Sequence, residues 1–338
     1  MKRLSYSLIA NDIGNMAIIY TLSISMFMGF MGLSIDLGML YTARTQLQNA
    51  TDASAMAGAG VLVIELDGNT VADANYDGAE EESTTLVEAN ALLSQLLEWH
   101  QGDTFIAGFW DEEVMDFTST GYTTDAKDLN AVHVRLRRSI DTFFMKIFGI
   151  HSVPVAAQST AFVGCAGNGA RADLPIAINV DKLNEPFEVI VLNSENEENG
   201  QWTSFDIWPI NKNTINPYIL GEAYGGIDPP PMIIGDDIYM NNGVITPLFS
   251  TLETRFNREK NEDNEYRVCL PVVRWQPPQN RGTLVGFVHF VITDVLASGG
   301  PEGKQVVGYM HDDPIVAEGS ISGGACFGVR ASRAVMLK

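Results

Sequence analysis

The hydrophobic pattern of the chain begins with one long apolar run. No charged residue occurs between Ile13 and Ile35, and as a helix this run would span about 34 Å at 1.5 Å per residue. That length slightly exceeds the hydrocarbon core of a bilayer, which is about 30 Å thick. Glycines within the run are ordinary in membrane helices. We therefore expect a transmembrane helix over residues 14–36.

A helical pattern continues beyond this run. Residues 37–65 contain no proline, and an apolar stripe with spacings of three, four and seven residues is formed by Leu40, Leu47, Ala50, Ala57 and Val61. A stretch of small residues favours close packing against a neighbouring helix or sheet; it consists of Ala53, Ala55, Ala57, Gly58, Ala59 and Gly60. We expect a helical stalk over residues 37–66, continuous with the membrane helix as a rod of about 75 Å.

The charges on either side of the apolar run predict its orientation. Lys2 and Arg3 precede the run, whereas Asp36, Arg44 and a strongly acidic region follow it. The positive-inside bias places residues 1–13 in the cytoplasm and the remainder outside. A cleaved signal peptide is disfavoured, because the run is too long and the first Ala-x-Ala sites come about 20 residues too late. A core helix of a soluble protein is disfavoured because few core helices have so long an uncharged run.

The region from residue 67 to residue 165 has mixed helical and strand patterns. We expect helices over 84–99, capped by Ser83, and over 141–148, capped by Asp141 and ended by Gly149. Strand patterns occupy residues 104–110, 131–140 and 151–163. The turn-rich segment 165–173 is expected to be a linker.

Strand patterns dominate the remaining residues, 174–338. They are expected at 174–180, 187–192, 266–273, 283–295, 305–310 and 326–337, with helices at 213–220 and 244–257. The predicted class is therefore α+β: a long N-terminal transmembrane and stalk helix, an α+β unit, and a β-rich C-terminal domain. Trp202, Phe205 and Trp208 are interpreted as a core patch, with an exposed protein-binding patch as the alternative.

Charge and cysteine content narrow the function. The net charge of −21 argues against binding nucleic acid, which requires clustered cations. The short basic cluster Arg135, Arg137 and Arg138 alternates as a solvated sheet face would. Three cysteines, Cys165, Cys269 and Cys326, allow one disulfide and one free thiol outside the cytoplasm, or three buried thiols. Sequence does not choose among the pairings.

Candidate chemistry is sparse. The five histidines are scattered, and the sequence contains no HExxH, GxSxG, GxxxxGK[ST] or GxGxxG pattern. The acidic pairs Asp236-Asp237 and Asp312-Asp313 are the best candidate metal ligands. An EF-hand reading from Asp236 fails because Ile238 and Met240 fall on ligand positions. We expect no catalytic residues, cofactor, metal or small-molecule substrate.

Three N-terminal segments resemble the signature of the TadE/TadG-like family of Flp (tight adherence) pilus-assembly proteins. They are GNMAIIY at 14–20, GLSIDLGMLY at 32–41 and RTQLQNATDASAMAGA at 44–59. Residues 130–136, 143–149 and 153–157 also resemble TadG-like members. The resemblance implies an inner-membrane component of the machine that builds Flp pili.

The chain departs from the sequence patterns of this family at two points, and these indicate which kind of member it resembles. Prepilin-like members resemble a pattern in which a Glu follows the cleavage Gly after four residues, and Ile19 occupies that position after Gly14. The Asp-x-Ser-x-Ser motif of von Willebrand A domains, which many TadG-like proteins carry, is absent. We therefore expect an unprocessed TadG-like member without that domain.

The expected function is that of a non-enzymatic, single-pass inner-membrane protein whose periplasmic bulk contacts other pilus-assembly or secretion proteins. Residues expected to pack in the membrane or on partner helices are Gly14, Gly29, Gly32, Asp36, Ala53, Ala57, Gly58 and Gly60. The alternatives are a minor pilin-like filament subunit and a periplasmic enzyme with an unrecognised site. Partners and oligomeric state stay open.

Overall fold

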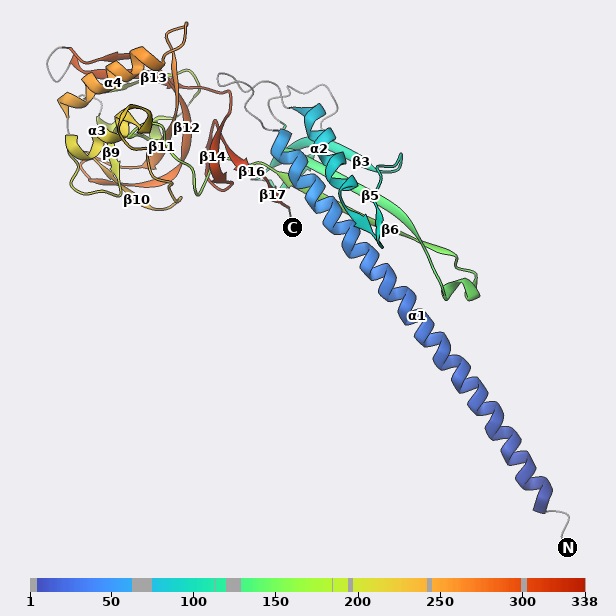
Figure 1. The fold of residues 1–338 in the computed structure, drawn as a ribbon. Helices are drawn as coiled ribbons and strands as arrows, with labels where there is room; N and C mark the ends of the chain where they lie inside the picture. Colours follow the sequence, from blue (N-terminus) through green and yellow to red (C-terminus); the bar gives the residue numbers. More distant parts are fainter. Residues whose placement is uncertain are drawn as a thin grey trace. The chain divides into compact units, whose positions relative to one another are not determined.

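The computed structural model describes residues 5–62, 75–112, 114–119, 129–183, 185–193, 197–241, 245–298 and 303–337. They form two compact units (Figure 1), made of residues 1–54, 84–105 and 134–159, and of residues 55–83, 106–133 and 160–338. The first helix contributes residues to both units, and so do three strands: β3 Thr104–Asp111, β5 Ala131–Asp141 and β6 Ser152–Phe162. The α+β class predicted from the sequence is confirmed: a long apolar helix precedes mixed elements and a strand-rich C-terminal region.

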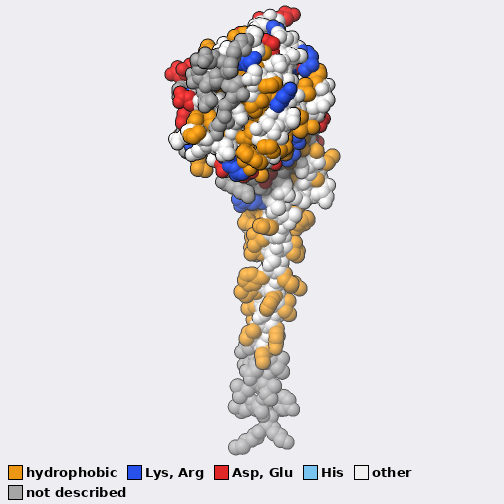
Figure 2. Space-filling model, turned by 90° about the vertical axis from the view of Figure 1, so that its left-hand side faces the viewer, with side chains coloured by type: hydrophobic (Ala, Val, Ile, Leu, Met, Phe, Trp, Pro, Cys, Tyr) orange, Lys and Arg blue, Asp and Glu red, His pale blue; other side chains and the backbone are white. Residues whose placement is uncertain are grey.

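Helix α1, Ser5–Leu62, is one uninterrupted helix of 58 residues. Hydrophobic side chains cover its membrane-length part in the view of Figure 2, and large apolar residues from Met16 to Ile35 are exposed. The Thr21 and Ser34 hydroxyls donate to the carbonyl oxygens of Ala17 and Phe30, at 2.8 Å each. These polar groups therefore need no water. Among the described residues, α1 is the one helix long and apolar enough to cross a membrane.

Beyond residue 36, α1 buries one face. The fully or nearly buried positions recur every three or four residues at Asp36, Ala43, Leu47, Ala50, Ser54, Ala55, Gly58, Ala59 and Leu62. The expected stripe is correct at Leu47 and Ala50, whereas Leu40, Ala57 and Val61 are only half-buried. The buried face also includes the small polar residues Ser54 and Thr51, and the Thr51 hydroxyl donates to Gln48 O at 2.8 Å.

A five-stranded sheet has the strand order β17-β6-β5-β3-β4. Its strands are β3 Thr104–Asp111, β4 Asp116–Thr118, β5 Ala131–Asp141, β6 Ser152–Phe162 and β17 Val335–Met336. In β5 burial alternates from Val134 to Asp141, as the sequence pattern predicts. Within the second unit, buried Asn130 joins three strands. Its side chain pairs with the Trp110 backbone, and its carbonyl oxygen accepts from Val163 N at 2.7 Å.

The helix expected over 84–99 is wrong. Helix α2 spans Tyr76–Glu88, and a small hairpin of β1, Ala91–Leu92, and β2, Gln95–Leu96, follows it. Leu93 and Ser94 have positive φ angles of 49° and 71°, which form a hairpin turn and break a helix. Leu93 N also donates to Gln46 Oε1 at 2.8 Å. The leucines of this segment therefore lie in a hairpin whose turn is bonded to α1, and their helix-like spacing does not produce a helix.

The second unit contains a larger sheet of the order β10-β9-β7-β11-β12-β13-β8, with β15 paired to β12. Its strands are β7 Ile176–Asn179, β8 Val189–Leu192, β9 Gly200–Phe205, β10 Asp237–Met240, β11 Tyr266–Arg274, β12 Arg281–Leu296, β13 Gln305–Met310 and β15 Ala325–Phe327. The helices α3, Lys212–Leu220, and α4, Thr246–Glu259, share its hydrophobic core. The short strands β14, Ile315–Ile321, and β16, Val329–Arg333, pair in parallel.

Two expectations for this unit need revision. The strand expected at 326–337 is three short strands, because Gly328 has a φ of +80° and breaks the ladder. Of the three aromatics expected in a core patch, Trp202 and Phe205 are buried, but Trp208 is 59% exposed. The helices expected at 213–220 and 244–257 are confirmed within two residues at each end.

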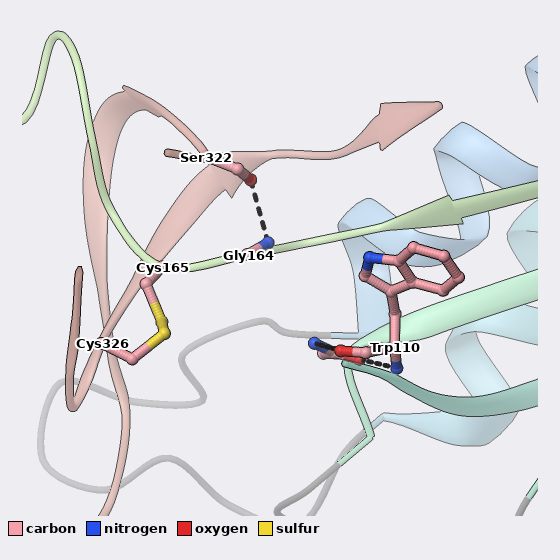
Figure 3. The surroundings of a disulfide bond; sticks show 6 residues. Trp110, Gly164, Cys165, Ser322 and Cys326 are labelled. Atoms are coloured by element: carbon pink, nitrogen blue, oxygen red, sulfur yellow. Dashed lines mark hydrogen bonds between the residues drawn. A yellow bond between two sulfur atoms is a disulfide. The ribbon is translucent and has the colours of Figure 1, made fainter. Parts of the chain in front are cut away.

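A disulfide joins Cys165 to Cys326 (Figure 3). The segment after Cys165, expected to be a linker, is bonded into the second unit: Gly164 N donates to Ser322 Oγ and Ala166 N to Val329 O, both at 2.9 Å. Cys269 is free and buried, and burial raises the pKa of its thiol well above the usual value. It is therefore a protonated core side chain.

We predict that C326S destabilises the second unit. The crosslink closes a loop of 161 residues, and its loss is expected to lower the free energy of unfolding by roughly 2–5 kcal/mol. Thermal unfolding with and without reductant measures the effect. The control Cys269→Ala should stay sensitive to reductant, whereas C326S should not. An unfolding midpoint of C326S equal to that of the unaltered chain would contradict the prediction.

Candidate functional site

The eight residues expected to pack in the membrane or on partners lie along α1 in different environments. Gly14 lies within the helix, and a Cβ atom added at Gly29 or Gly60 would meet nothing within 4 Å. Ala53 and Ala57 are half-buried. Gly32, Asp36 and Gly58 are buried against other parts of the chain. The small-residue face of α1 is thus partly occupied within the chain itself.

The Asp36 carboxylate makes the most specific contact of the first unit. Its Oδ1 accepts from Phe143 N at 2.9 Å, and its Oδ2 accepts from Phe144 N at 2.9 Å and Met145 N at 2.7 Å. The residue is completely buried. A buried carboxylate requires such donors, because an ionised group without partners is very costly to bury. We call Gly32, Asp36 and Phe143–Met145 the anchor clamp.

The donors come from the turn between β5 and β6. Here Met145–Phe148 forms a 3-10 helix, which Gly149 ends with a φ of 83°. The first amides of a helix have no partner within it, and the expected cap, Asp141, is exposed. The N-cap residue, Phe144, makes no side-chain capping hydrogen bond. Asp36 of α1 supplies the acceptors instead, so a contact distant in sequence replaces the local cap.

Gly32 completes the clamp one helical turn before Asp36. Residues four apart lie on the same face of a helix, so Gly32 and Asp36 face the same turn. A Cβ atom added at Gly32 would lie 2.6 Å from Phe144 Cδ1, which is closer than two non-bonded carbon atoms approach each other. Glycine at this position therefore allows the Phe144 ring to lie directly on the helix backbone.

A polar seam continues the contact between α1 and β6. Gln48 Nε2 donates to Asp52 Oδ1 at 2.7 Å and to Ser159 Oγ at 2.9 Å. The Ser159 hydroxyl also contacts Asp52 and lies 3.1 Å from Thr51 Oγ1. These residues were not singled out by sequence reasoning, although Gln48, Thr51 and Asp52 lie at spacings of three and four. The seam fixes how α1 is rotated against the sheet.

Gly58 makes the close helix contact of the second unit. A Cβ atom added there would lie 3.1 Å from Ala79 O and would collide with Ser83 Oγ, both on α2. The interpretation of Ser83 as a helix cap is wrong, because Ser83 lies inside α2 and is buried against α1. The site therefore requires glycine for packing within the chain.

The basic cluster at Arg135, Arg137 and Arg138 is only partly a solvated face. Arg135 and Arg137 are exposed, whereas Arg138 is buried and its Nη1 lies 2.7 Å from Asp103 Oδ1. Asp103 also accepts from the backbone amides of His100 and Arg137. Alternation of the strand places Arg138 on the inner side, and the carboxylate compensates its charge there.

One possible ligand atom of the acidic cluster at His311 is already bonded to the backbone. The side chains of His311, Asp312 and Asp313 lie close together. However, His311 Nδ1 accepts from Asp313 N at 3.0 Å, so this lone pair is used by the backbone. Neighbouring His289 donates from Nδ1 to Asp313 O, and burial lowers its pKa to about 4. His289 is therefore a neutral core residue at physiological pH.

Two protein-family models match the N-terminal region of the chain. Residues 14–61 match the family model described as "Putative Flp pilus-assembly TadE/G-like". Residues 41–161 match the model described as "Putative Tad-like Flp pilus-assembly". No curated protein and no solved structure matches the chain. The matched residues include the anchor clamp, the polar seam and Gly58.

We predict that Asp36→Ala opens the anchor clamp. Three amides lose their acceptor, and an unsatisfied buried donor costs about 1–3 kcal/mol. Hydrogen exchange of the full chain should show lost protection of the Phe143–Met145 amides. Asp36→Asn, which retains one carbonyl oxygen, should lose less. The control Asp141→Ala should retain protection; equal protection in Asp36→Ala would refute the assignment.

We predict opposite effects of alanine at two neighbouring glycines of α1. Gly60→Ala meets no neighbour and should stabilise the helix by up to about 1 kcal/mol. Gly58→Ala collides with α2, so its steric cost should exceed the same gain in helix propensity. Thermal unfolding of the two variants measures the difference. A midpoint of Gly58→Ala at or above that of Gly60→Ala would show that this contact is loose.

Proposed function

We propose that the chain is a non-enzymatic, membrane-anchored component of Flp pilus assembly, a role supported by the similarity of its N-terminal region to two Flp pilus-assembly family models. The observation that carries the proposal is α1 itself. Its first part has an uncharged, exposed apolar surface of membrane length, and its outer part is packed into folded regions of the same chain. Such a helix holds a folded body at a fixed point on a membrane.

The proposed location of the folded body is outside the cytoplasm, with the N-terminus inside. Lys2 and Arg3 before the apolar run support this orientation. The Cys165–Cys326 disulfide supports it independently, because such bonds persist in oxidising compartments such as the periplasm. In a bacterial cell, the anchoring membrane would then be the inner membrane.

The proposed partners are other proteins of the pilus-assembly machine. The contacts would be protein–protein contacts, because the motifs expected of a catalytic set are missing and the chain is strongly acidic. On α1, Gly29 and Gly60 have open space around them, and Met56 between them is 42% exposed. These positions are the proposed places where partner helices approach, since small residues permit close backbone contact.

A permanent tether is favoured over a filament subunit. The prepilin-like pattern has a Glu after the cleavage site, and Ile19 occupies that place, which argues against processing. The Asp36 clamp also ties the outer end of the membrane segment to the body of the protein. Release of the helix into a filament would have to carry this body along.

We predict that deleting the gene abolishes surface pili while the major pilin accumulates normally. Electron microscopy of the cells and immunoblotting of the pilin measure the two results. A chain with an N-terminal epitope tag should restore piliation, remain in the inner membrane and retain its tag. The matched variant Asp36→Ala should restore piliation less well than Asp141→Ala.

Normal piliation of the deletion strain would exclude the proposed function. Recovery of the tagged chain in sheared, purified filaments would instead support the role of a minor filament subunit. Loss of the tag at the membrane would show that the N-terminus is processed despite Ile19.

A further inference from the structure

The turn between β5 and β6 is unusually apolar and exposed. We call residues 142–151 the tip. Five large apolar side chains of the tip are exposed to the following extents: Phe143 68%, Phe144 40%, Ile147 80%, Phe148 72% and Ile150 43%. A surface turn in water normally carries polar residues, and a contiguous apolar group of this kind marks a contact surface.

The position of the tip along α1 is fixed by the anchor clamp. Phe144 lies against Gly32, and the amides of Phe143–Met145 bond to Asp36. The tip therefore lies beside residues 32–36, within about 6 Å along the helix axis. Figure 1 shows the β5–β6 hairpin extending along α1 to this level. This level is the outer end of the uncharged membrane segment.

The helix surface at the same level is also apolar. Met31 and Ile35 are 59% and 55% exposed, and Leu37, just beyond Asp36, is 54% exposed. The exposed side chains of the tip thus extend the lipid-facing surface of α1 sideways. Any medium that covers this end of the membrane helix also reaches the tip.

Charge and hydrogen bonding of the tip suit a lipid interface. Lys146 is its one charged residue between Thr142 and Ile150, in a chain with a net charge of −21. A flexible lysine can reach anionic headgroups while its stem stays in apolar surroundings. Seven tip amides donate within the protein, at positions 142–145, 147, 149 and 150. Paired amides remove the main cost of placing a turn in an apolar medium.

We propose that the tip inserts into the outer boundary of the lipid bilayer beside α1, as a second membrane contact of the chain. This inference rests on the proposed membrane anchoring. The exposed Phe and Ile side chains lie among the acyl chains near the headgroups, to the depth typical of interfacial segments, about 5–10 Å. The Asp36 carboxylate lies beneath the tip, away from lipid, and is bonded to the amides of the tip.

Two membrane contacts would fix the rotation and the depth of α1 in the bilayer. A single helix can rotate and shift in depth within a bilayer, since its tilt is set by its neighbours and anchors. A tip bonded to one face of the helix prevents rotation and sets the depth at residue 36. The polar seam at Gln48 and Ser159 then holds the hairpin rigidly against α1.

The test uses the full chain in vesicles of phosphatidylcholine and phosphatidylglycerol, with an environment-sensitive fluorophore on a single introduced cysteine. Ile147→Cys tests the tip. Met31→Cys reports the membrane helix, and the exposed Gln95→Cys of the β1–β2 hairpin reports water. All three carry Cys269→Ala, and non-reducing electrophoresis verifies the native disulfide. Quenching by an aqueous reagent and by a lipid-borne nitroxide is measured for each.

The expected result is a blue-shifted label at position 147 that the lipid-borne nitroxide quenches and the aqueous reagent does not. A label quenched from water like the one at position 95 overturns the inference while the label at Met31 still reports anchoring. A label shielded from both reagents also overturns it, since protein, such as a second copy, then covers the tip. A Met31 label open to water would refute the anchoring itself.

Adding Asp36→Ala to the Ile147→Cys chain tests whether the depth of the tip is set by the anchor clamp or only by the apolar side chains of the tip. If the clamp sets the depth, the label should lose part of its blue shift and of its quenching by the lipid-borne nitroxide. Asp141→Ala is the matched control and should change neither. An unchanged signal in both variants would show that the depth of the tip does not depend on Asp36.

Discussion

The hydrogen bonds of the Asp36 carboxylate join the end of the uncharged part of α1 to the turn between β5 and β6. On its N-terminal side α1 has no charge for a membrane's length, and on its other side the helix is packed against a sheet. An ionised carboxylate at that boundary can face water or find donors in the protein. Here it finds three, on a turn more than 100 residues later in the chain. The uncharged segment of α1 and the β5–β6 turn are thereby bonded to each other within the first unit.

The clamp, the polar seam and the Gly58 contact together make α1 an internal element of the fold over its outer half. The three contacts use different interactions. In the clamp, backbone amides donate to a carboxylate; in the polar seam, side chains bond to each other; at Gly58, the absence of a Cβ atom allows close packing. Each contact can form in only one orientation of α1 about its own axis. In the proposed membrane-anchored arrangement, contacts of this kind would hold α1 against the strands and the helix that it touches.

Sequence reasoning succeeded where one pattern dominated a long segment. The uninterrupted α1, the alternating β5 and the helices near residues 213 and 246 follow directly from charge-free length and periodicity. It failed where a distant contact decided the structure. Leu93 and Ser94 break the leucine pattern because a turn is held by Gln46, and Asp36 replaces Asp141 as the acceptor for the turn. Gly32 and Asp36 were singled out, but their partner could not be read from local spacing.

The order of synthesis gives the clamp a further consequence. Asp36 leaves the ribosome 107 residues before its first donor, Phe143. In the proposed arrangement, the apolar helix would enter the bilayer while the carboxylate still has no protein partner. Only when the β5–β6 hairpin has formed can this end of the helix be closed over. The contacts at this end of the helix are thus completed by a later part of the chain, and a chain truncated before residue 143 would lack all three donors to Asp36.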